Sequence, residues 1–210
     1  MQKIIPAILT SDPADLRTKL TLFKGQSNWL HIDIMDNKFV PNVSVNLFEL
    51  GEASQHFNLE IHLMAQNPIS YFEDCKEIGA KRVVFHYEAE SDVEKVKKEA
   101  EKHEFQLGLA LNPSTGVQPL AVFRNILDSV LLMGVEPGAQ GHEFVPSTLL
   151  KAQETRKLCP DLLLGADGGI GEENIKAMFS AGVDYAVVGS KIMNTQDPVA
   201  AFRKLEEMVQ

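Results

Sequence analysis

Eight short β-rich runs alternate with amphipathic helical segments along this chain, and no other feature of the sequence constrains the fold as strongly. Strand–helix–strand units of this kind are right-handed and build a parallel sheet. Eight is also the number of strands that closes a (β/α)8 barrel. The predicted strands cover residues 3–9, 29–34, 59–64, 82–87, 106–111, 129–135, 162–167 and 185–189, and the predicted helices cover 12–23, 69–78, 93–102, 147–158, 172–181 and 198–208.

A doubly wound open sheet is the alternative fold for such an alternation. It gives no reason for polar residues at the ends of several strands, whereas a barrel gathers those ends around one mouth, where barrel enzymes perform their chemistry. The 210 residues are 44% hydrophobic, enough for one substantial core, and no Pro-, Gly- or Ser-rich linker interrupts the series. We therefore predict an α/β fold, a single (β/α)8 TIM barrel over residues 1–210, with its active site at the C-terminal ends of the strands.

Two histidines and two aspartates lie near the ends of predicted strands. His31 and Asp33 are two residues apart in one strand, so they share a face. A structural Asp–His hydrogen bond would explain that pair alone, and His62 alone would be explained as a buried core histidine. Together with Asp167, however, they form a set that suits one divalent ion such as zinc, iron, manganese or cobalt. Two carboxylates at one rim can also exchange the roles of proton donor and acceptor.

Glycine-rich turns follow the last three predicted strands. Tight turns between strand and helix need glycine in any case, but backbone N–H groups in such turns also approach anions closely. Barrels frequently bind phosphate with the loops after their last strands. Three such turns on adjacent strands therefore favour a phosphate site, with the candidate residues Gly138, Ala139, Gln140, Gly141, Gly168, Gly169, Gly189 and Ser190.

Three methionines, Met35, Met64 and Met133, lie at or just beyond strand ends. Methionine usually fills gaps in a hydrophobic core. Because these three would meet at one rim, we expect them to form an apolar cap that keeps water away from a reactive intermediate.

The charge and the two cysteines exclude several classes of protein. A formal net charge of −9 disfavours non-specific nucleic-acid binding. No apolar run is long enough to span a membrane, and residues 1–6 have no signal-peptide pattern. Cys75 and Cys159 lie far apart without CxxC spacing, which indicates reduced thiols. We therefore expect a cytoplasmic protein that binds neither nucleic acid nor a membrane.

The sequence resembles the ribulose-phosphate 3-epimerase family in motifs that occur in the same order along nearly the whole chain. The most specific are HIDIMDNKFVPN at 31–42 and MGVEPGAQGHEFVP at 133–146. They are accompanied by HLM at 62–64, FHYEAE at 85–90, LALNPST at 109–115, DGGI at 167–170 and VVGS at 187–190.

The resemblance implies a metal-dependent isomerase acting on a phosphorylated ketose, D-ribulose 5-phosphate. It implies that His31, Asp33, His62 and Asp167 bind the metal. Asp33 would accept and Asp167 would donate a proton on opposite faces of C3, giving D-xylulose 5-phosphate through an enediolate. It also implies that the glycine turns hold the substrate phosphate, that the methionines form the cap, and that the protein is a homo-oligomer.

Several positions depart from the family pattern. Alanine replaces a usual serine at Ala7, glutamate replaces an aspartate at Glu60, and asparagine replaces a glycine at Asn37; the phosphate loop carries Gln140 and His142. None of these replaces a predicted metal ligand or proton-transfer group. They leave open the same chemistry on a longer ketose such as D-allulose 6-phosphate. A non-catalytic phosphosugar-binding barrel is a further alternative, disfavoured because a binding module has no use for two buried acids beside a metal.

Overall fold

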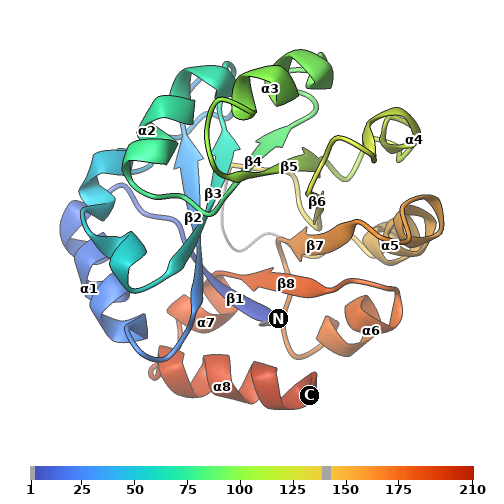
Figure 1. The fold of residues 1–210 in the computed structure, drawn as a ribbon. Coiled ribbons are helices and arrows are strands. Elements are labelled where there is room, and N and C mark those ends of the chain that lie inside the picture. Colours follow the sequence, from blue (N-terminus) through green and yellow to red (C-terminus); the bar gives the residue numbers. More distant parts are fainter. Residues whose placement is uncertain (1–2, 139–142) are drawn as a thin grey trace.

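The computed structural model describes residues 3–138 and 143–210, which contain eight parallel strands closed into a barrel. Each strand pairs with the next along the chain, and the last pairs with the first (Figure 1). This closure confirms the predicted TIM barrel and excludes the open sheet. The strands are β1 (Ile4–Ile8), β2 (Trp29–Met35), β3 (Asn58–Met64), β4 (Arg82–His86), β5 (Gln106–Leu111), β6 (Ser129–Met133), β7 (Leu163–Asp167) and β8 (Tyr185–Val188).

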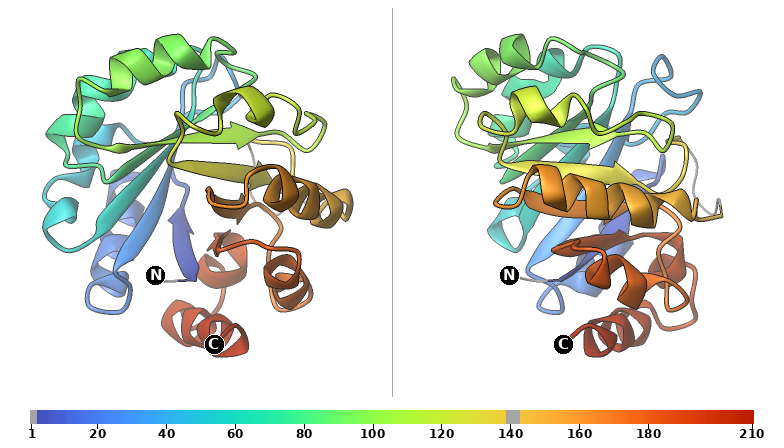
Figure 2. Two further views of the ribbon diagram at one scale, coloured as in Figure 1. Left: turned by 45° about the vertical axis from the view of Figure 1, so that its right-hand side comes forward. Right: turned by 90° about the vertical axis from the view of Figure 1, so that its right-hand side faces the viewer.

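Helices surround the barrel, as Figure 2 shows from two further directions. None of the helices in the described ranges is long and apolar enough to cross a membrane. The helices are α1 (Pro13–Phe23), α2 (Phe72–Glu77), α3 (Val93–Ala100), α4 (Leu120–Phe123), α5 (Ser147–Leu158), α6 (Ile175–Ser180), α7 (Ser190–Met193) and α8 (Pro198–Met208), with short 3-10 helices at η1 (Leu47–Leu50), η2 (Ala53–Gln55) and η3 (Pro68–Tyr71).

Aspartate caps fix where several helices begin. The side chain of Asp197 accepts a hydrogen bond from the backbone N–H of Ala200 at 3.0 Å, and Pro198 follows as the first helical residue. Asp12 caps α1 in the same way through the N–H of Ala14 at 2.8 Å. Such caps satisfy backbone donors that have no partner within the helix. The sequence predicted α8 with these same bounds.

Alternate residues of each strand face two different hydrophobic layers. Ile32 and Ile34 belong to the large outer core, which also contains helix residues such as Leu16. A smaller inner core fills the barrel and contains Ile5 and Tyr185. His31 and Asp33 share one face, as predicted, and because it is opposite to that of Ile32 and Ile34 they point into the barrel.

Candidate active site

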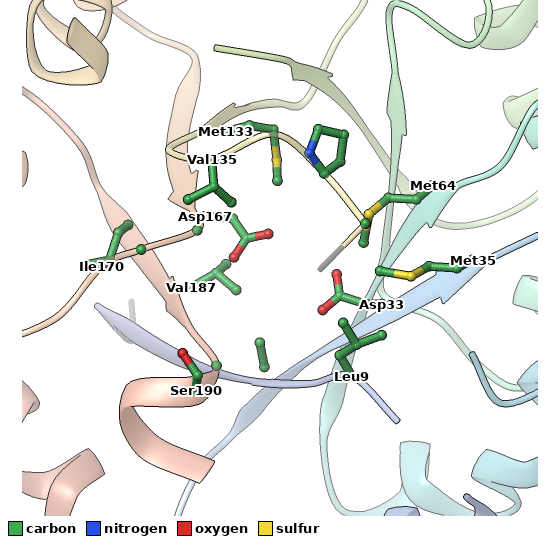
Figure 3. A pocket seen from close by; sticks show the side chains of 16 residues that line it. Leu9, Asp33, Met35, Met64, Met133, Val135, Asp167, Ile170, Val187 and Ser190 are labelled. Carbon is green, nitrogen blue, oxygen red and sulfur yellow. The ribbon is translucent and has the colours of Figure 1, made fainter. Parts of the chain in front are cut away.

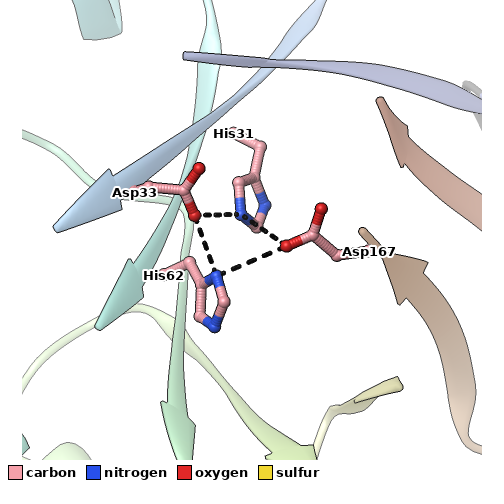
Figure 4. A group of neighbouring side chains, drawn as sticks. All are labelled: His31, Asp33, His62 and Asp167. Atoms are coloured by element: carbon pink, nitrogen blue, oxygen red, sulfur yellow. Dashed lines mark hydrogen bonds and ion pairs between the residues drawn. The ribbon is translucent and has the colours of Figure 1, made fainter. Parts of the chain in front are cut away.

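His31, Asp33, His62 and Asp167 meet inside the barrel near the C-terminal ends of their strands, and their ligand atoms all lie within 4.8 Å of one another (Figure 4). His62 Nδ1 lies 3.0 Å and His31 Nε2 lies 3.3 Å from the same oxygen, Asp33 Oδ1. Asp167 Oδ2 approaches these two nitrogens to 3.7 Å and 3.9 Å. The structure thus brings together all four residues that the sequence selected as metal ligands.

Strand register explains why the four groups converge. β2 and β3 pair in parallel with Asp33 opposite His62, so two inward-facing positions lie side by side. Asp167 is the last residue of β7 and reaches the cluster from the other side of the barrel. Both imidazoles are fully buried, while the carboxylates retain slight exposure to the cavity above them. Two nitrogen and two oxygen donors in one enclosed cluster fit a borderline divalent metal ion.

The two aspartates of the cluster have different proton affinities. Burial favours the neutral form of Asp33, but hydrogen bonds from His31 and His62 outweigh it and hold the pKa of Asp33 below its usual range. Burial raises the pKa of Asp167 to about 7, the charge of His31 opposes that rise, and the charge of Asp33 adds to it. A pair of carboxyl groups with separated pKa values is typical of sites that use one as base and the other as acid.

Glu60 binds the ring nitrogen of His31 that faces away from Asp33. Its Oε1 accepts a hydrogen bond from His31 Nδ1 at 2.6 Å, and its Oε2 accepts from Arg82 Nη1 at 2.6 Å and from Tyr185 Oη at 2.9 Å. Burial disfavours this charge, but the contacts with His31 and Arg82 lower the pKa of Glu60 to about 2. The sequence marked Glu60 only as a departure from the family, although its position opposite His31 in the register accounts for the contact.

His86 and Glu88 form a second support, behind His62, which the sequence analysis missed. His86 Nε2 lies 2.9 Å from His62 Nε2, and His86 Nδ1 lies 3.3 Å from Glu88 Oε2. The two histidine rings are nearly parallel, with an interplanar angle of 25° and centroids 5.0 Å apart, and they meet through their Nε2 nitrogens. Burial lowers the pKa of His86 to about 4. A histidine at the end of β4, in the FHYEAE motif, was the available signal.

A cavity of about 550 Å³, including its open mouth, lies over the cluster. Asp33 and Asp167 face each other across it from β2 and β7 (Figure 3). All three predicted cap residues, Met35, Met64 and Met133, line this cavity and are buried. Apolar side chains that the sequence did not single out complete the wall: Leu9, Val135, Ile170 and Val187.

Bare backbone lines another part of the same cavity. Gly168 and Gly169 have φ angles of +99° and +65°, in the left-handed region that favours glycine. A Cβ atom on Gly169 would lie 2.8 Å from the backbone nitrogen of Phe144, so no side chain fits there. Of the predicted phosphate-binding residues, the structure brings Gly138, Gly168, Gly169, Gly189 and Ser190 to the cavity, whereas Ala139, Gln140 and Gly141, like His142, lie outside the described residues.

Two of the departures from the family pattern are accommodated by the backbone and the cavity. Asn37 has a φ of +58°, a conformation that asparagine tolerates better than most residues, so the turn after β2 is kept. The side chain of Asp36 fixes this turn by accepting hydrogen bonds from the N–H groups of Lys38 and Phe39, both at 2.9 Å. Ala7 lines the cavity with a methyl group in place of the usual hydroxyl.

The sequence model described as "Ribulose-phosphate 3 epimerase family" matches residues 3–193. A ribulose-phosphate 3-epimerase of Schizosaccharomyces pombe is 34% identical over 99% of this chain and 93% of its own length. The "Ribulose-phosphate 3-epimerase, cytoplasmic isoform" of Oryza sativa subsp. japonica is 34% identical over 98% of this chain and 94% of its own length.

Among solved structures, the 3-hexulose-6-phosphate synthase of Salmonella typhimurium superposes with a TM-score of 0.77 over 99% of this chain and 98% of that chain. Only 15% of the aligned residues are identical, so this likeness concerns the fold alone. The match to the family, by contrast, spans most of the chain and agrees with the motifs in the sequence. The chain belongs to the ribulose-phosphate 3-epimerase family and is, by that membership, an epimerase, a type of isomerase.

Proposed function

We propose that this protein interconverts D-ribulose 5-phosphate and D-xylulose 5-phosphate by inverting the configuration at C3. The names of its relatives support the substrate, since they are ribulose-phosphate 3-epimerases. The observation that carries the reaction is the position of two carboxylates on opposite sides of one cavity, Asp33 from β2 and Asp167 from β7. A planar intermediate between them is accessible to a proton from either side.

The reaction needs only proton transfer. The C3 proton is acidified by the neighbouring C2 ketone, and Asp33 takes it, so that the electron pair of the C3–H bond enters an enediolate. Asp167 then gives a proton to C3 from the opposite face, which forms the epimer. Asp33 has gained and Asp167 has lost one proton, and exchange with solvent or the reverse reaction restores both. The three methionines line the cavity and exclude water from the intermediate.

We further propose that His31, Asp33, His62 and Asp167 hold one divalent ion, of zinc, iron, manganese or cobalt. The four converging ligand atoms and the burial of both histidines support this assignment. When bound, such an ion supplies Lewis-acid stabilisation of the negative charge on the enediolate oxygens. The substrate phosphate is proposed to contact the backbone of Gly168, Gly169 and Gly189, with Gly138 and Ser190 nearby on the cavity wall.

D-allulose 6-phosphate, one carbon longer, is the competing substrate. The observation that favours it is Ala7, whose methyl group lines the cavity where the family usually presents a hydroxyl. The two substrates share the reacting C2–C3 unit, so the same two carboxylates would act on either. Their kcat/KM values decide between them.

The test follows solvent deuterium into the product. With each of the four metals in turn, D-ribulose 5-phosphate is incubated with the protein in D₂O, and C3 is observed by NMR. We expect D-xylulose 5-phosphate with deuterium at C3. Asp33→Asn and Asp167→Asn should each lower kcat about 100- to 10,000-fold, whereas the exposed Asp161→Asn should not. Metal content is measured in every variant, because both catalytic aspartates are also proposed ligands.

Product without deuterium at C3, or a metal-loaded Asp167→Asn variant with normal kcat, would contradict the two-carboxylate reaction. A higher kcat/KM for D-allulose 6-phosphate would reassign the substrate and leave the chemistry in place. The remaining expectations are also proposals: a cytoplasmic homo-oligomer that binds neither nucleic acid nor a membrane. Light scattering of the purified protein measures its oligomeric state.

A further inference from the structure

We infer that His86 and Glu88 are positioning residues that fix the tautomer of His62, so that its Nδ1 presents a lone pair to the metal cluster. The inference rests on the proposed metal site but concerns residues outside it. His86 is the last residue of β4, fully buried, and Glu88 follows two residues later. Neither residue belongs to the four proposed ligands.

His62 and His86 contact each other through their ring nitrogens. Their Nε2 atoms are 2.9 Å apart, and two ring nitrogens at this distance form a hydrogen bond only when one carries a proton and the other does not. A nitrogen that binds a metal ion carries no proton. A bound metal ion would replace the proton that His62 Nδ1 donates to Asp33, so the proton of neutral His62 would then sit on Nε2. His62 then donates and His86 accepts.

His86 also contacts the carboxylate of Glu88. If His86 Nε2 accepts, the proton of neutral His86 sits on Nδ1, which lies 3.3 Å from Glu88 Oε2. A carboxylate can only accept, so Glu88 requires a proton on His86 Nδ1. In this series of hydrogen bonds, His62 donates to His86 and His86 donates to Glu88. Glu88 sets the direction of donation, because its carboxylate can only accept.

The loop after β5 anchors the side chain of Glu88. Its Oε1 accepts hydrogen bonds from the backbone N–H of Asn112, at 2.8 Å, and from the hydroxyl of Thr115. The ring of Phe39 packs against that of His86, with ring centroids 4.8 Å apart. The loop after β5 thus holds the carboxylate, and the loop after β2 holds the ring.

The two metal histidines are therefore supported differently. Metal-binding histidines usually donate their second ring N–H to a carboxylate or a carbonyl group, which fixes the tautomer. His31 does so directly, through Glu60 at 2.6 Å. His62 instead contacts His86, and His86 contacts the carboxylate of Glu88. A substitution of Glu88 would therefore affect metal binding by His62 only through His86.

The sharpest variant is Glu88→Gln, which keeps the shape of the side chain. Because Asn112 and Thr115 need an acceptor, the amide oxygen stays with them and the amide NH₂ faces His86 Nδ1. His86 must then carry its proton on Nε2, where it opposes the Nε2 proton of His62. We expect zinc affinity to fall about 10- to 100-fold, the range found when partners of metal-binding histidines are removed.

Three further variants of this chain are compared with Glu88→Gln. His86→Leu removes the acceptor and should weaken zinc binding as much as Glu88→Gln. His86→Gln places a carbonyl oxygen near the former Nε2 and should restore most of the lost affinity. Glu90→Gln is the matched control, since it changes charge equally two residues away, where Glu90 pairs with Lys95 at 2.8 Å. Its zinc affinity should be unchanged.

The first measurement is zinc affinity, by competition with a chelator. The second is the ring ¹⁵N NMR spectrum of the zinc-loaded, unmodified protein, which needs no variant to fold. We expect a proton on Nε2 of His62 and on Nδ1 of His86. A proton on His86 Nε2, or equal zinc affinity in Glu88→Gln, His86→Leu and Glu90→Gln, would overturn the inference. Failure of the unmodified protein to bind zinc or any other divalent metal would instead overturn the proposed metal site, and this inference with it.

Discussion

Glu60 allows a charged arginine to be buried inside the barrel. Arg82 is almost completely buried, with its guanidinium 4.7 Å from the ring centroid of Trp29, and Glu60 supplies the opposite charge at 2.6 Å. Glu60 also accepts from His31 and Tyr185, so one carboxylate connects the inner core to the metal cluster. Removing one partner of a buried ion pair leaves the other charge without compensation in a medium of low dielectric constant.

Glu60→Gln should therefore lower the free energy of unfolding by about 3–5 kcal/mol. Chemical denaturation followed by circular dichroism measures this loss. The matched control is Glu173→Gln, which breaks the exposed pair between Glu173 and Lys191 and should leave stability close to that of the unmodified chain, because exposed pairs contribute little. A loss no larger than that of the control would show that Glu60 and Arg82 are not coupled as described.

The same carboxylate predicts a dependence of stability on pH. The pKa of Glu60 is about 2 in the folded chain, against an ordinary value of 4.5 when the chain is unfolded. As pH falls, the unfolded chain binds this proton first, so the contribution of Glu60 is full above about pH 5 and is lost toward pH 2.

The measurement is the difference in unfolding free energy between the unmodified chain and Glu60→Gln, at several values between pH 7 and pH 3. We expect this difference to shrink as pH falls from about 5 toward 3. A difference that grows over that range would contradict the assignment.

Individual residues were predictable where a local pattern placed them. His31 and Asp33 share a face by strand alternation, and all four proposed ligands lie near strand ends that a barrel must gather together. The partners of these residues were not predictable in the same way. The contacts of Glu60 with His31 and of His86 with His62 depend on side-chain length and on the register between neighbouring strands. A short stretch of sequence does not specify that register.

The turn after β7 is held tightly against the loop that precedes α5. The side chain of Asn174 accepts from the N–H of Gly171 at 3.0 Å and donates to the carbonyl of Gly169 at 2.9 Å. Gly169 itself has a left-handed φ and lies against the backbone of Phe144. Any side chain at this position would both strain the turn and push the loop away.

Gly169→Ala should therefore raise KM for the phosphorylated substrate, because the proposed phosphate contact needs this backbone close to the cavity. Gly25→Ala is the matched control. Gly25 also has a left-handed φ, of +74°, but a Cβ there meets nothing within 4 Å, and it lies in the turn between α1 and β2, at the opposite end of the barrel. Both changes should destabilise the fold, and steady-state kinetics should show a higher KM for Gly169→Ala alone. Equal KM values in the two variants would remove this turn from the phosphate site.

Strands and capped helices were predicted well because their signals are local. α8 has its cap, its proline and its apolar spacing in one segment. The predicted helix at 69–78 is instead η3 followed by α2, and the helix predicted at 172–181 begins only at Ile175, after the turn that Asn174 fixes. α4 and α7 were missed, since four residues are too few to show a helical period.

Three strands contribute to the cluster of His31, Asp33, His62 and Asp167, and they come from distant parts of the chain. A metal ion bound there would connect β2 and β3 to β7 across the barrel. The unfolded chain does not present these groups together, so binding energy would add to the stability of the folded state.

A divalent metal at 100 times its dissociation constant should stabilise the fold by about 2.7 kcal/mol, a rise in Tm of roughly 5–11 °C for a chain of this size. Differential scanning calorimetry with added metal and with chelator measures this increment. His62→Ala should abolish it, while the exposed His56→Ala should retain it. A metal-dependent increment that survives in His62→Ala would place the ion elsewhere.

The barrel as a whole was predictable from the number and order of its strands, because parallel strands joined by helices have few alternatives. Closure itself could be argued only indirectly, from polar residues at strand ends. That residues 1–210 form one domain stays a prediction; the barrel strands run from Ile4 to Val188.

Pairing of β1 with β8 has a consequence for how the chain is made. Ile4 pairs with Ala186, so 182 positions separate these partners. At about 5–20 residues per second, a ribosome needs roughly 10–40 s to add that length. Throughout this interval β1 has no closing partner, and exposed strand edges pair readily with other chains. We expect nascent chains that stall between residues 167 and 185 to require a chaperone, although they already contain all four residues of the proposed metal site.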